Sequence, residues 1–390
     1  MVNLLIILFW LAVFFILLSY VFYPLLVVFM PSTQKKPACF TDQDELPEVT
    51  VIMAAYNEQS VIEAKLESVF RCSYPNSKLS VMVGSDQSND QTDEIVLNLS
   101  RKHPNLQLVR FENRTGKSGI INTLVAHSKT PIIIATDANI LFDENTISNL
   151  VKNFKEESIH LVGGNIVYRD KKETGIALQE HVYLNWENKI KEGESKRWWV
   201  ALGVEGGCYA IRRKSFSQIP PLTFMEDFYI TMAVLYKGGN VWFEPEAQCY
   251  EDVSTEIGEE FKRKVRISIG NWQNLSRFAG MLTKPFWPIG FAFLAHKVLR
   301  WFTPFLLIFA LGIAYVLADG NNIFSGMLTL SLVIILLLPL DFLLMKRNMH
   351  TGILRFINHF LMMNLALLVG FIHYTKGVKS NVWQPTKRNQ

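Results

Sequence analysis

The sequence predicts an α/β domain with a mostly parallel sheet, joined to α-helices that cross a membrane. Two patterns support this prediction. In the middle of the chain, short runs rich in β-branched residues alternate with stretches of helical periodicity, which is typical of parallel sheets. At both ends, long apolar runs carry no charged side chain, and hydrophobic residues make up 49% of the 390 residues.

Four apolar runs have the length of a membrane helix. Residues 1–30 carry no charge and exceed the roughly 20 apolar residues that cross a bilayer. This run lacks a basic start and a small-residue cleavage site, so we expect residues 1–33 to be a retained N-terminal anchor. Three further runs lie near the C-terminus, at residues 302–318, 323–340 and 357–374. We therefore expect three transmembrane helices over 302–376. Buried core helices are the alternative, which four such runs at the two ends argue against.

Basic residues beside the apolar runs predict the orientation of the chain. A Lys-Lys pair at 35–36 follows the first run, and a Lys-Arg pair at 346–347 follows the third. Because cytosolic segments are enriched in Lys and Arg, we expect residues 34–280 to be cytosolic and the N-terminus to lie outside. The basic tail, residues 377–390, conflicts with this arrangement, since four crossings would place it outside. The side of the tail stays open.

Two basic amphipathic stretches precede the second apolar run. The first covers residues 259–277, where apolar residues recur at helical spacing among lysines and arginines. It predicts a helix on the membrane surface or, through Arg266, a clamp on a diphosphate; both can hold together. The second stretch, around residues 296–301, is typical of interfacial anchoring, and we expect an interfacial amphipathic helix over 281–301.

Polar clusters follow three of the predicted strands. The strands are expected over residues 49–55, 79–84, 106–110 and 131–136, with helices over 58–70 and 92–101 and after residue 116. The clusters are Tyr56-Asn57-Glu58, Asp86 with its followers, and Asp137-Ala138-Asn139. Ligands of parallel sheets bind outside the carboxyl ends of the strands, so this edge is the candidate site. The net charge of +4 is too modest and dispersed to indicate nucleic acid, and the four cysteines form no C-x-x-C pair.

Each acidic cluster has a functional and a structural interpretation. Asp86 could accept hydrogen bonds from a base or ribose, or its segment could cap a helix. Asp137 and Asn139 present two oxygens that suit Mg²⁺ or Mn²⁺, or they could form an Asx turn. The Glu226-Asp227 pair could supply a general base at a cleft edge, or it could start a helix. The residues alone leave these alternatives open.

Together and in this order, the clusters resemble the family 2 glycosyltransferases with a GT-A fold, among them hyaluronan, cellulose and poly-N-acetylglucosamine synthases. The resemblance covers about residues 49–272 and fits the flanking apolar runs. It rests on the strand 51–58, D-x-S-x-D-x-T at 86–92, Gly116-Lys117-Ser118 with Asn122, Asp137-x-Asn139, Gly206-Gly207-Cys208 and Glu226-Asp227. The departures are Ala55 for proline, Asn139 for the second acid of D-x-D, and Met225 for the threonine of T-E-D. Q-x-x-R-W appears as Arg263-Lys264-Val265-Arg266-Ile267, without its glutamine and tryptophan.

The resemblance implies a role for each matching residue. Tyr56, Glu58, Asp86, Lys117 and Asp137 would bind the nucleotide-sugar. Asp137 and Asn139 would hold a divalent metal, Mg²⁺ or Mn²⁺. Asp227, with Glu226 and Arg266, would carry the catalysis.

The acceptor side is implied in the same way. Gly206, Gly207 and Cys208 would form the acceptor loop. Trp199 could stack on the acceptor sugar in place of the missing tryptophan, with a packing role as the alternative.

The function expected from this resemblance is inverting transfer of a sugar from a nucleotide-sugar, UDP-linked, to a growing exopolysaccharide at a bacterial inner membrane. Transfer of one sugar to a lipid acceptor, such as a polyprenyl phosphate or ceramide, is the alternative. A non-catalytic membrane scaffold or transport subunit is an alternative of another class. The expected partners are the nucleotide-sugar donor, a saccharide or lipid acceptor and membrane lipid.

Overall fold

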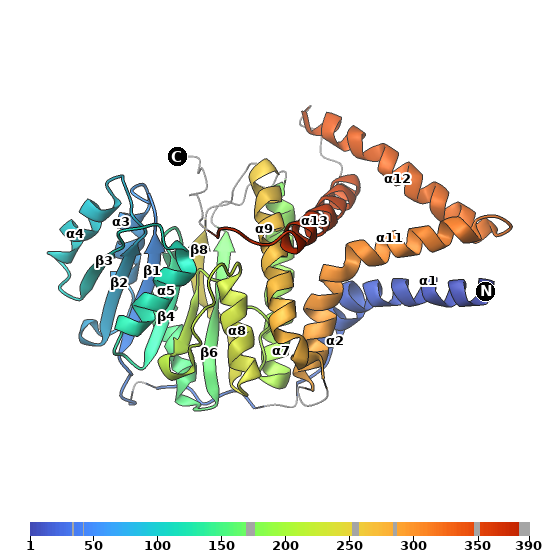
Figure 1. Cartoon of the computed structure of the whole chain (residues 1–390). Helices are drawn as coiled ribbons and strands as arrows, with labels where there is room; N and C mark the ends of the chain where they lie inside the picture. The colour runs from blue at the N-terminus through green and yellow to red at the C-terminus, as the bar shows by residue number, and fades with distance from the viewer. Residues whose placement is uncertain are drawn as a thin grey trace.

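The computed structural model describes residues 1–32, 35–41, 43–168, 176–251, 257–283, 287–346 and 352–381. It shows an α/β domain with long apolar helices that extend from one side of it (Figure 1). The strands are β1 (Val49–Ala55), β2 (Leu79–Ser85), β3 (Leu106–Arg110), β4 (Ile132–Asp137), β5 (Leu141–Phe142), β6 (Ile159–Tyr168), β7 (Tyr209–Arg212) and β8 (Asn240–Glu251).

The helices alternate with these strands and then continue into the apolar regions. They are α1 (Val2–Leu17), α2 (Tyr23–Phe29), α3 (Ile62–Phe70), α4 (Thr92–Ser100), α5 (Gly116–His127), α6 (Thr146–Lys152), α7 (Ile176–Trp198), α8 (Glu226–Tyr236), α9 (Ile257–Phe278), α10 (Ile289–Ala292), α11 (Leu299–Leu317), α12 (Asn322–Lys346) and α13 (Gly352–Thr375). Two π-helical turns, η1 (Leu18–Phe22) and η7 (Phe293–Val298), join α1 to α2 and α10 to α11. Short 3₁₀ turns are η2 (Asn76–Lys78), η3 (Asn153–Lys155), η4 (Arg213–Ser215) and η5 (Ala279–Leu282).

The eight strands form one sheet in the order β3-β2-β1-β4-β7-β6-β8-β5. β1 pairs in parallel with β2 and β4, β2 with β3, and β6 with β8. Only β7 and β5 among the described strands run against the others. The predicted mostly parallel sheet is therefore confirmed, and so are the four strands predicted up to residue 136, to within a residue.

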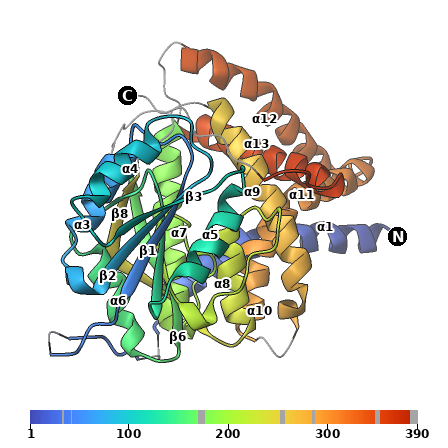
Figure 2. The same cartoon turned by 60° about the vertical axis from the view of Figure 1, so that its left-hand side comes forward.

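Two layers of helices cover the sheet. The side chains of Val51 and Met53 on β1 pack with α3, α4 and α6, whereas those of Ile52 and Ala54 pack with α5 and α8 on the other face. Figure 2 shows these helices on the two sides of the sheet. Every residue of β1 is buried, which explains why all of them except Thr50 are apolar. The helix expected over 58–70 begins only at Ile62, because the preceding residues form a turn that is tied to the loop after β2.

Four described helices are long and apolar enough to cross a membrane. They are Val2–Phe29, Ile289–Leu317, Asn322–Pro339 and Leu354–Thr375. The second one differs from the expectation of a separate interfacial helix over 281–301. From Ile289 onward it is continuous with α11, and the side chains of His296 and Trp301 are buried against the domain rather than facing lipid. Part of the predicted basic tail, residues 382–390, lies outside the described residues.

A buried cluster of charges fixes the second membrane helix to α7. The ring nitrogens of His296 lie 2.7 Å from Glu194 Oε1 and 3.0 Å from Glu187 Oε2. Glu187 also accepts hydrogen bonds from Lys297 and Arg300. Burial alone would raise the pKa of Glu187, but Arg300, Lys297 and His296 hold it well below its usual value.

The first membrane helix joins the same cluster. Tyr23 Oη donates a hydrogen bond to Glu194 Oε1 at 2.6 Å. A side chain at Gly193 of α7 would strike the backbone of Val27, so α2 and α7 are in close backbone contact. The first two membrane helices are therefore docked rigidly on the domain.

Candidate active site

The loops after β1 and β2 form one hydrogen-bonded unit at the carboxyl edge of the sheet. Glu58 N donates to Thr92 Oγ1 at 2.8 Å, and Asn89 N donates to Asn57 Oδ1 at 3.0 Å. Asp90 accepts hydrogen bonds from Thr92 N and Thr92 Oγ1 at the start of α4, although the N-cap residue of this helix is Gln91. Asn57 has φ +53°, a conformation that asparagine tolerates better than most residues. The first two predicted clusters thus lie side by side.

Asp86 organises the next segment of this edge. Its fully buried carboxylate accepts hydrogen bonds from Thr115 N at 2.5 Å and Gly116 N at 3.2 Å, and it pairs with Arg114 Nε at 3.1 Å. These bonds set the loop that leads into α5. A hydrogen bond from a nucleoside to Asp86 stays a prediction. The nucleoside would have to share the two carboxylate oxygens with the groups that already bind them.

An aromatic–cation stack lies beside Asp86. The guanidinium carbon of Arg114 lies 3.3 Å from the centroid of the Tyr56 ring. Sequence reasoning selected Tyr56 but missed Arg114. The signal was present, because Arg114 comes two residues before the Gly116-Lys117 segment and follows β3, at the same edge as the predicted clusters.

Lys117 connects the clusters of β4 and α8. Its Nζ lies 2.7 Å from Asp137 Oδ1 and 2.6 Å from Glu226 Oε1. Burial alone would lower the pKa of Lys117, but the two carboxylates outweigh burial and hold it well above its usual value. The ammonium group is therefore a fixed positive charge between two acids.

Asp227 lies next to this group across the backbone of Gly206. Asp227 Oδ2 accepts a hydrogen bond from Gly206 N at 2.9 Å. A Cβ at Gly206 would lie 3.2 Å from Asp227 Oδ2 and 3.3 Å from Lys117 Nζ, so the absence of a side chain there keeps the two groups close. Burial first, and then the charge of Glu226, raise the pKa of Asp227 to about 7, partly offset by Lys117. Such a carboxylate is suited to take a proton near neutral pH.

Oxygen ligands for a divalent ion gather beside Asp137. Strand β5 pairs antiparallel with β8, with Leu141 opposite Tyr250, which brings the end of β8 next to Asn139. Asn139 Nδ2 donates to Glu251 Oε1 at 3.3 Å. A carboxylate, an amide oxygen and a second carboxylate suit Mg²⁺ or Mn²⁺ chemically, although no group of three His, Cys, Asp or Glu residues able to hold a metal occurs in the described part of the chain. Sequence reasoning missed Glu251, because its position depends on the pairing of β5 with β8.

The comparisons with known proteins agree with this geometry. Residues 50–219 match the family model described as Glycosyl transferase family 2. The chain contains a family 2 glycosyltransferase domain. It is 26% identical over 264 residues to the poly-beta-1,6-N-acetyl-D-glucosamine synthase of Staphylococcus aureus (strain COL), covering 65% of this chain and 62% of that protein. With the Staphylococcus epidermidis synthase it shares 24% identity over 255 residues, covering 64% of this chain and 58% of that protein. The chain thus matches less than two thirds of the length of these relatives.

A solved structure shows the fold. A mannosyltransferase of Pyrobaculum calidifontis, determined in complex with GDP-Man and Mn²⁺, aligns with a TM-score of 0.70 and 22% identity. The alignment covers 94% of this chain and 99% of that one. The family 2 domain therefore has the GT-A fold that the sequence predicted, and the likeness extends beyond it into the apolar helices.

Two residues predicted for the acceptor side of the family 2 domain lie elsewhere. Cys208 is fully buried on the sheet face that carries α3, with its Sγ 2.7 Å from that of Cys249, so it does not face an acceptor. Cys208 directly precedes β7, and its carbonyl accepts a hydrogen bond from Gly164 N of β6. Of the predicted loop, Gly206 and Gly207 remain, the former beside Asp227 and the latter accepting a hydrogen bond from Thr136 Oγ1 through its carbonyl.

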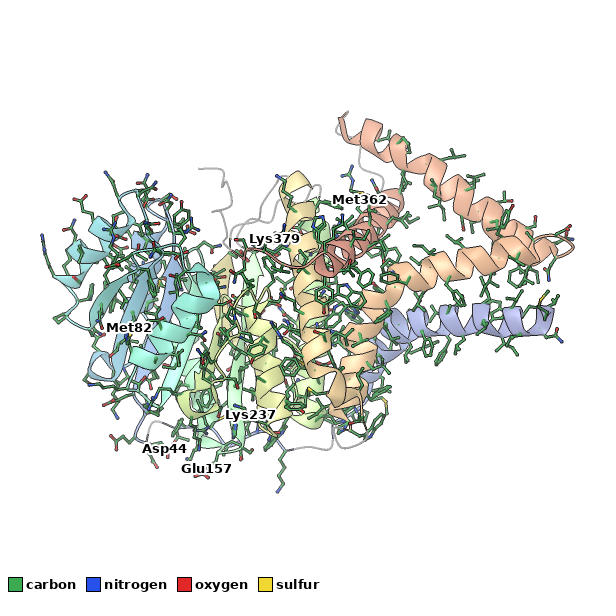
Figure 3. All side chains as sticks on the ribbon, viewed as in Figure 1. Asp44, Met82, Glu157, Lys237, Met362 and Lys379 are labelled. Atoms are coloured by element: carbon green, nitrogen blue, oxygen red, sulfur yellow. The ribbon has the colours of Figure 1, made fainter. Side chains whose placement is uncertain are left out.

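Trp199 is also misplaced for acceptor binding. Its carbonyl accepts a hydrogen bond from Val241 N at the beginning of β8, and its Nε1 donates to Lys35 O at 3.2 Å. This is the amino edge of β6 and β8, opposite the site, where Figure 3 labels Glu157 and Lys237. The residues from Trp199 to Gly206 cross the full height of the sheet, so nearness in sequence did not mean nearness in space. The packing interpretation of Trp199 holds.

Helix α9 carries Arg266 toward the site edge. Gly270, one turn later on α9, packs against Met225, and Gln273 Oε1 accepts a hydrogen bond from Phe224 N. Arg266 is exposed on the same side of α9, which is compatible with its predicted contact with a diphosphate. Burial raises the pKa of Glu251 to about 6. The charge of Arg263, which sequence reasoning did not select, offsets part of this rise, so Arg263 acts on the same edge.

Replacing Lys117 with Met should destabilise the domain, because Asp137 and Glu226 then lose the ammonium group between them. These ion pairs are partly buried, with the side chains of Lys117 and Glu226 27% and 14% exposed, so we expect a loss of about 2 kcal/mol in the free energy of unfolding, less than a fully buried pair would cost. Denaturant unfolding of the detergent-solubilised protein measures it. Lys78→Met is the control, since its partner Glu45 has a side chain that is 90% exposed and such pairs contribute about 0–1 kcal/mol. Equal losses in both variants would contradict the bridging role of Lys117.

Proposed function

We propose that the protein is an inverting glycosyltransferase that uses a nucleotide-sugar, UDP-linked, to extend an exopolysaccharide at the membrane. The observation that carries the proposal is the meeting of Asp227 with the Lys117–Asp137–Glu226 group across Gly206. It supplies a base with a pKa near neutral next to a fixed positive charge, at the edge of a GT-A sheet where ligands bind.

The reaction follows from these groups. Asp227 takes the proton of an acceptor hydroxyl, whose oxygen attacks the anomeric carbon of the donor. The bond from that carbon to the diphosphate oxygen breaks, and the nucleoside diphosphate leaves with the bonding electrons. Lys117 and Arg266 stabilise the charge that develops on the diphosphate. The stacked Tyr56 and Arg114 offer a surface for the base of the nucleotide.

A divalent cation would be held by Asp137 and Asn139, with Glu251 beside them. Bound there, Mg²⁺ or Mn²⁺ would supply positive charge to the two phosphates of the donor. Each of these three side chains offers an oxygen ligand, which supports this part of the proposal.

The acceptor is proposed to be a growing polysaccharide, which the similarity to the staphylococcal synthases supports. Transfer of one sugar to a lipid acceptor is the second candidate, favoured by one observation. The aromatic residue considered for holding a sugar chain, Trp199, is engaged in packing, and so is Trp272 of α9, which packs with Phe305 and Phe371. A non-catalytic scaffold is disfavoured by the intact acids at the site.

We further propose that the protein is integral to a bacterial inner membrane, with the domain in the cytosol and the N-terminus outside. The helices that are apolar and long enough to cross a membrane support the integral location, and the Lys-Lys pair at 35–36 supports the orientation. In this orientation the site would also be open to nucleotide-sugars in the cytosol.

Purified protein in lipid nanodiscs should be incubated with a panel of labelled UDP- and GDP-sugars, with and without Mg²⁺ or Mn²⁺, and the products separated by size. We expect one UDP-sugar to give material that lengthens with time. A product that stays a singly glycosylated lipid, however long the reaction runs, would replace the polysaccharide proposal with the lipid acceptor. No transfer from any donor would contradict the proposed function itself.

Asp227→Asn should retain nucleotide-sugar binding and lose turnover by a factor on the order of 10² or more, because an amide cannot accept the proton. Binding is measured by calorimetry and turnover by release of the nucleoside diphosphate. Asp44→Asn, at an exposed surface pair with Lys155, is the control and should behave as wild type. Near-normal turnover of Asp227→Asn would reassign the base, with Glu226 next in line.

The same base predicts a pH dependence. Because Asp227 acts when deprotonated, kcat/KM should fall tenfold per pH unit as the pH drops below about 7 and level off above it. The charged groups facing Asp227 are Glu226 on α8, Lys117 on α5 and Glu205 before β7. A profile that stays flat from pH 5 to pH 8 would exclude Asp227 as the base.

Asp137→Ala should abolish metal-dependent nucleotide binding, whereas Asn139→Asp should be tolerated or tighten it. The reason is ligand charge, since a carboxylate binds a hard divalent ion more strongly than an amide oxygen does. Titration of Mn²⁺ followed by its electron paramagnetic resonance signal gives a readout independent of turnover. Unchanged nucleotide affinity and activity in excess chelator would remove the metal from the mechanism.

A further inference from the structure

We infer that α13 does not cross the membrane but lies along its surface, on the side of the catalytic domain, so that the chain crosses three times. The surface that α13 occupies is then the headgroup region of the bilayer. This inference concerns which parts of the chain share one side and is independent of the proposed transfer reaction. Three sets of contacts carry it.

The segment after α13 returns to the active site. Asn381 Nδ2 donates a hydrogen bond to Thr223 O at 3.3 Å, three residues before Glu226. The Asn381 side chain also lies beside Gly116, where a Cβ would be 3.2 Å from its Oδ1. The six residues that follow Thr375 can span at most about 20 Å. The hydrocarbon core of a bilayer is about 30 Å thick, so the end of α13 lies on the side of the domain. Figure 3 shows Lys379 beside the domain and not beyond the membrane helices.

The body of α13 packs on α9, which belongs to the domain. Ser268 Oγ of α9 donates a hydrogen bond to Leu367 O at 2.8 Å. A Cβ at Gly370 would lie 2.3 Å from Ser268 Cβ and 2.8 Å from the backbone oxygen of Val265, so the backbones of the two helices approach closely. Since α9 also holds Phe224 through Gln273, next to the active site, α13 is attached to the domain along its C-terminal half.

The contacts of α13 with the membrane helices show that it runs across them. Phe360 packs on Tyr20 at 5.5 Å between ring centroids, and Arg300 lies over the same Tyr20 ring at 5.5 Å. Phe371 packs on Phe305 at 5.0 Å. From Phe360 to Phe371 the axis of α13 advances about 16 Å, whereas from Arg300 to Phe305 the axis of α11 advances only about 8 Å. The 24-residue helix α13 is therefore strongly inclined to α11.

This inclination makes α13 too short to cross. A helix of 24 residues is about 36 Å long, and at the ratio above it would rise only about 18 Å along the direction of α11, well short of a 30 Å core. In Figure 1, α13 lies at the domain end of α1 and α11, whereas the ends of those two helices that are farther from the domain extend well beyond it. Leu365 and Ile372 are exposed apolar residues on one side of α13 that could dip into the bilayer surface.

Three crossings also remove the conflict between the basic tail and the other basic residues, which four crossings would place on opposite sides of the membrane. With α11 leading outward and α12 leading back, the Lys-Arg pair at 346–347, Lys376 and Lys379 all share the side of the Lys-Lys pair at 35–36. This is the distribution expected for cytosolic segments, and it adds attraction to anionic lipid headgroups.

Cysteines introduced one at a time can test the inference by their accessibility to a labelling reagent. The background carries Cys39→Ser, because the other three native cysteines are buried. Their burial also makes Cys72 and Cys208 unsuitable as reporters of sidedness. The reporters are Asn76→Cys on the domain, Asp319→Cys in the turn between α11 and α12, and Ser380→Cys in the tail. Cells are treated with a maleimide that cannot cross membranes, before and after permeabilisation.

We expect Asn76→Cys and Ser380→Cys to be labelled together, only after permeabilisation, and Asp319→Cys to be labelled in intact cells. If Asn76→Cys and Ser380→Cys react in intact cells while Asp319→Cys does not, the inference stands and only the proposed orientation is reversed. Any other grouping overturns it. Labelling of Ser380→Cys with Asp319→Cys shows that α13 crosses, and common labelling of all three shows that α11 and α12 do not.

Discussion

The active edge depends on one ammonium group shared among several carboxylates. Asp137 ends β4 and Glu226 begins α8, two elements that are far apart in sequence, and Lys117 on α5 lies within 2.7 Å of both. Without an opposite charge, burying these acids together would be unfavourable. The position of Lys117 in turn depends on Asp86, which holds the backbone of Thr115 and Gly116 at the start of α5. Charge and hydrogen bonding thus help to fix three loops of the sheet.

A second set of buried charges couples this edge to the membrane helices. Glu187 and Glu194 on α7 bind His296 and Arg300, and Glu194 also accepts a hydrogen bond from Leu202 N. Lys191 lies about one turn of α7 from both Glu187 and Glu194. It pairs with Glu205 at 2.6 Å, and Glu205 directly precedes Gly206. Helix α7 therefore contacts the membrane helices and the loop that positions Asp227. The same helix, α7, therefore fixes the docking of the membrane helices and supports the loop that places Asp227.

The sequence predicted those features that local pattern determines. The strand 49–55 is apolar except for Thr50 because β1 is buried on both faces, and Asp137 ends the similarly apolar strand β4. Residues whose roles depend on pairing between distant segments were missed or misplaced. Glu251 meets Asn139 only through the pairing of β5 with β8, and Trp199 points away because the chain crosses the sheet between it and Gly206. Helix α13 matched a membrane span in composition, and its inclination follows only from the contacts of Phe360 and Phe371 with the membrane helices.

The shared ammonium group also links donor binding to the strength of the base. The pKa of Asp227 reaches about 7 through burial and the charge of Glu226, while Lys117 holds it lower than it would otherwise be. A donor diphosphate that pairs with Lys117 would neutralise part of this charge. The carboxylate of Asp227 would then hold a proton more tightly and be a stronger base when the donor is present. In the absence of the donor, Lys117 remains paired with Asp137 and Glu226, so the arrangement favours proton abstraction when a sugar is in place to be transferred.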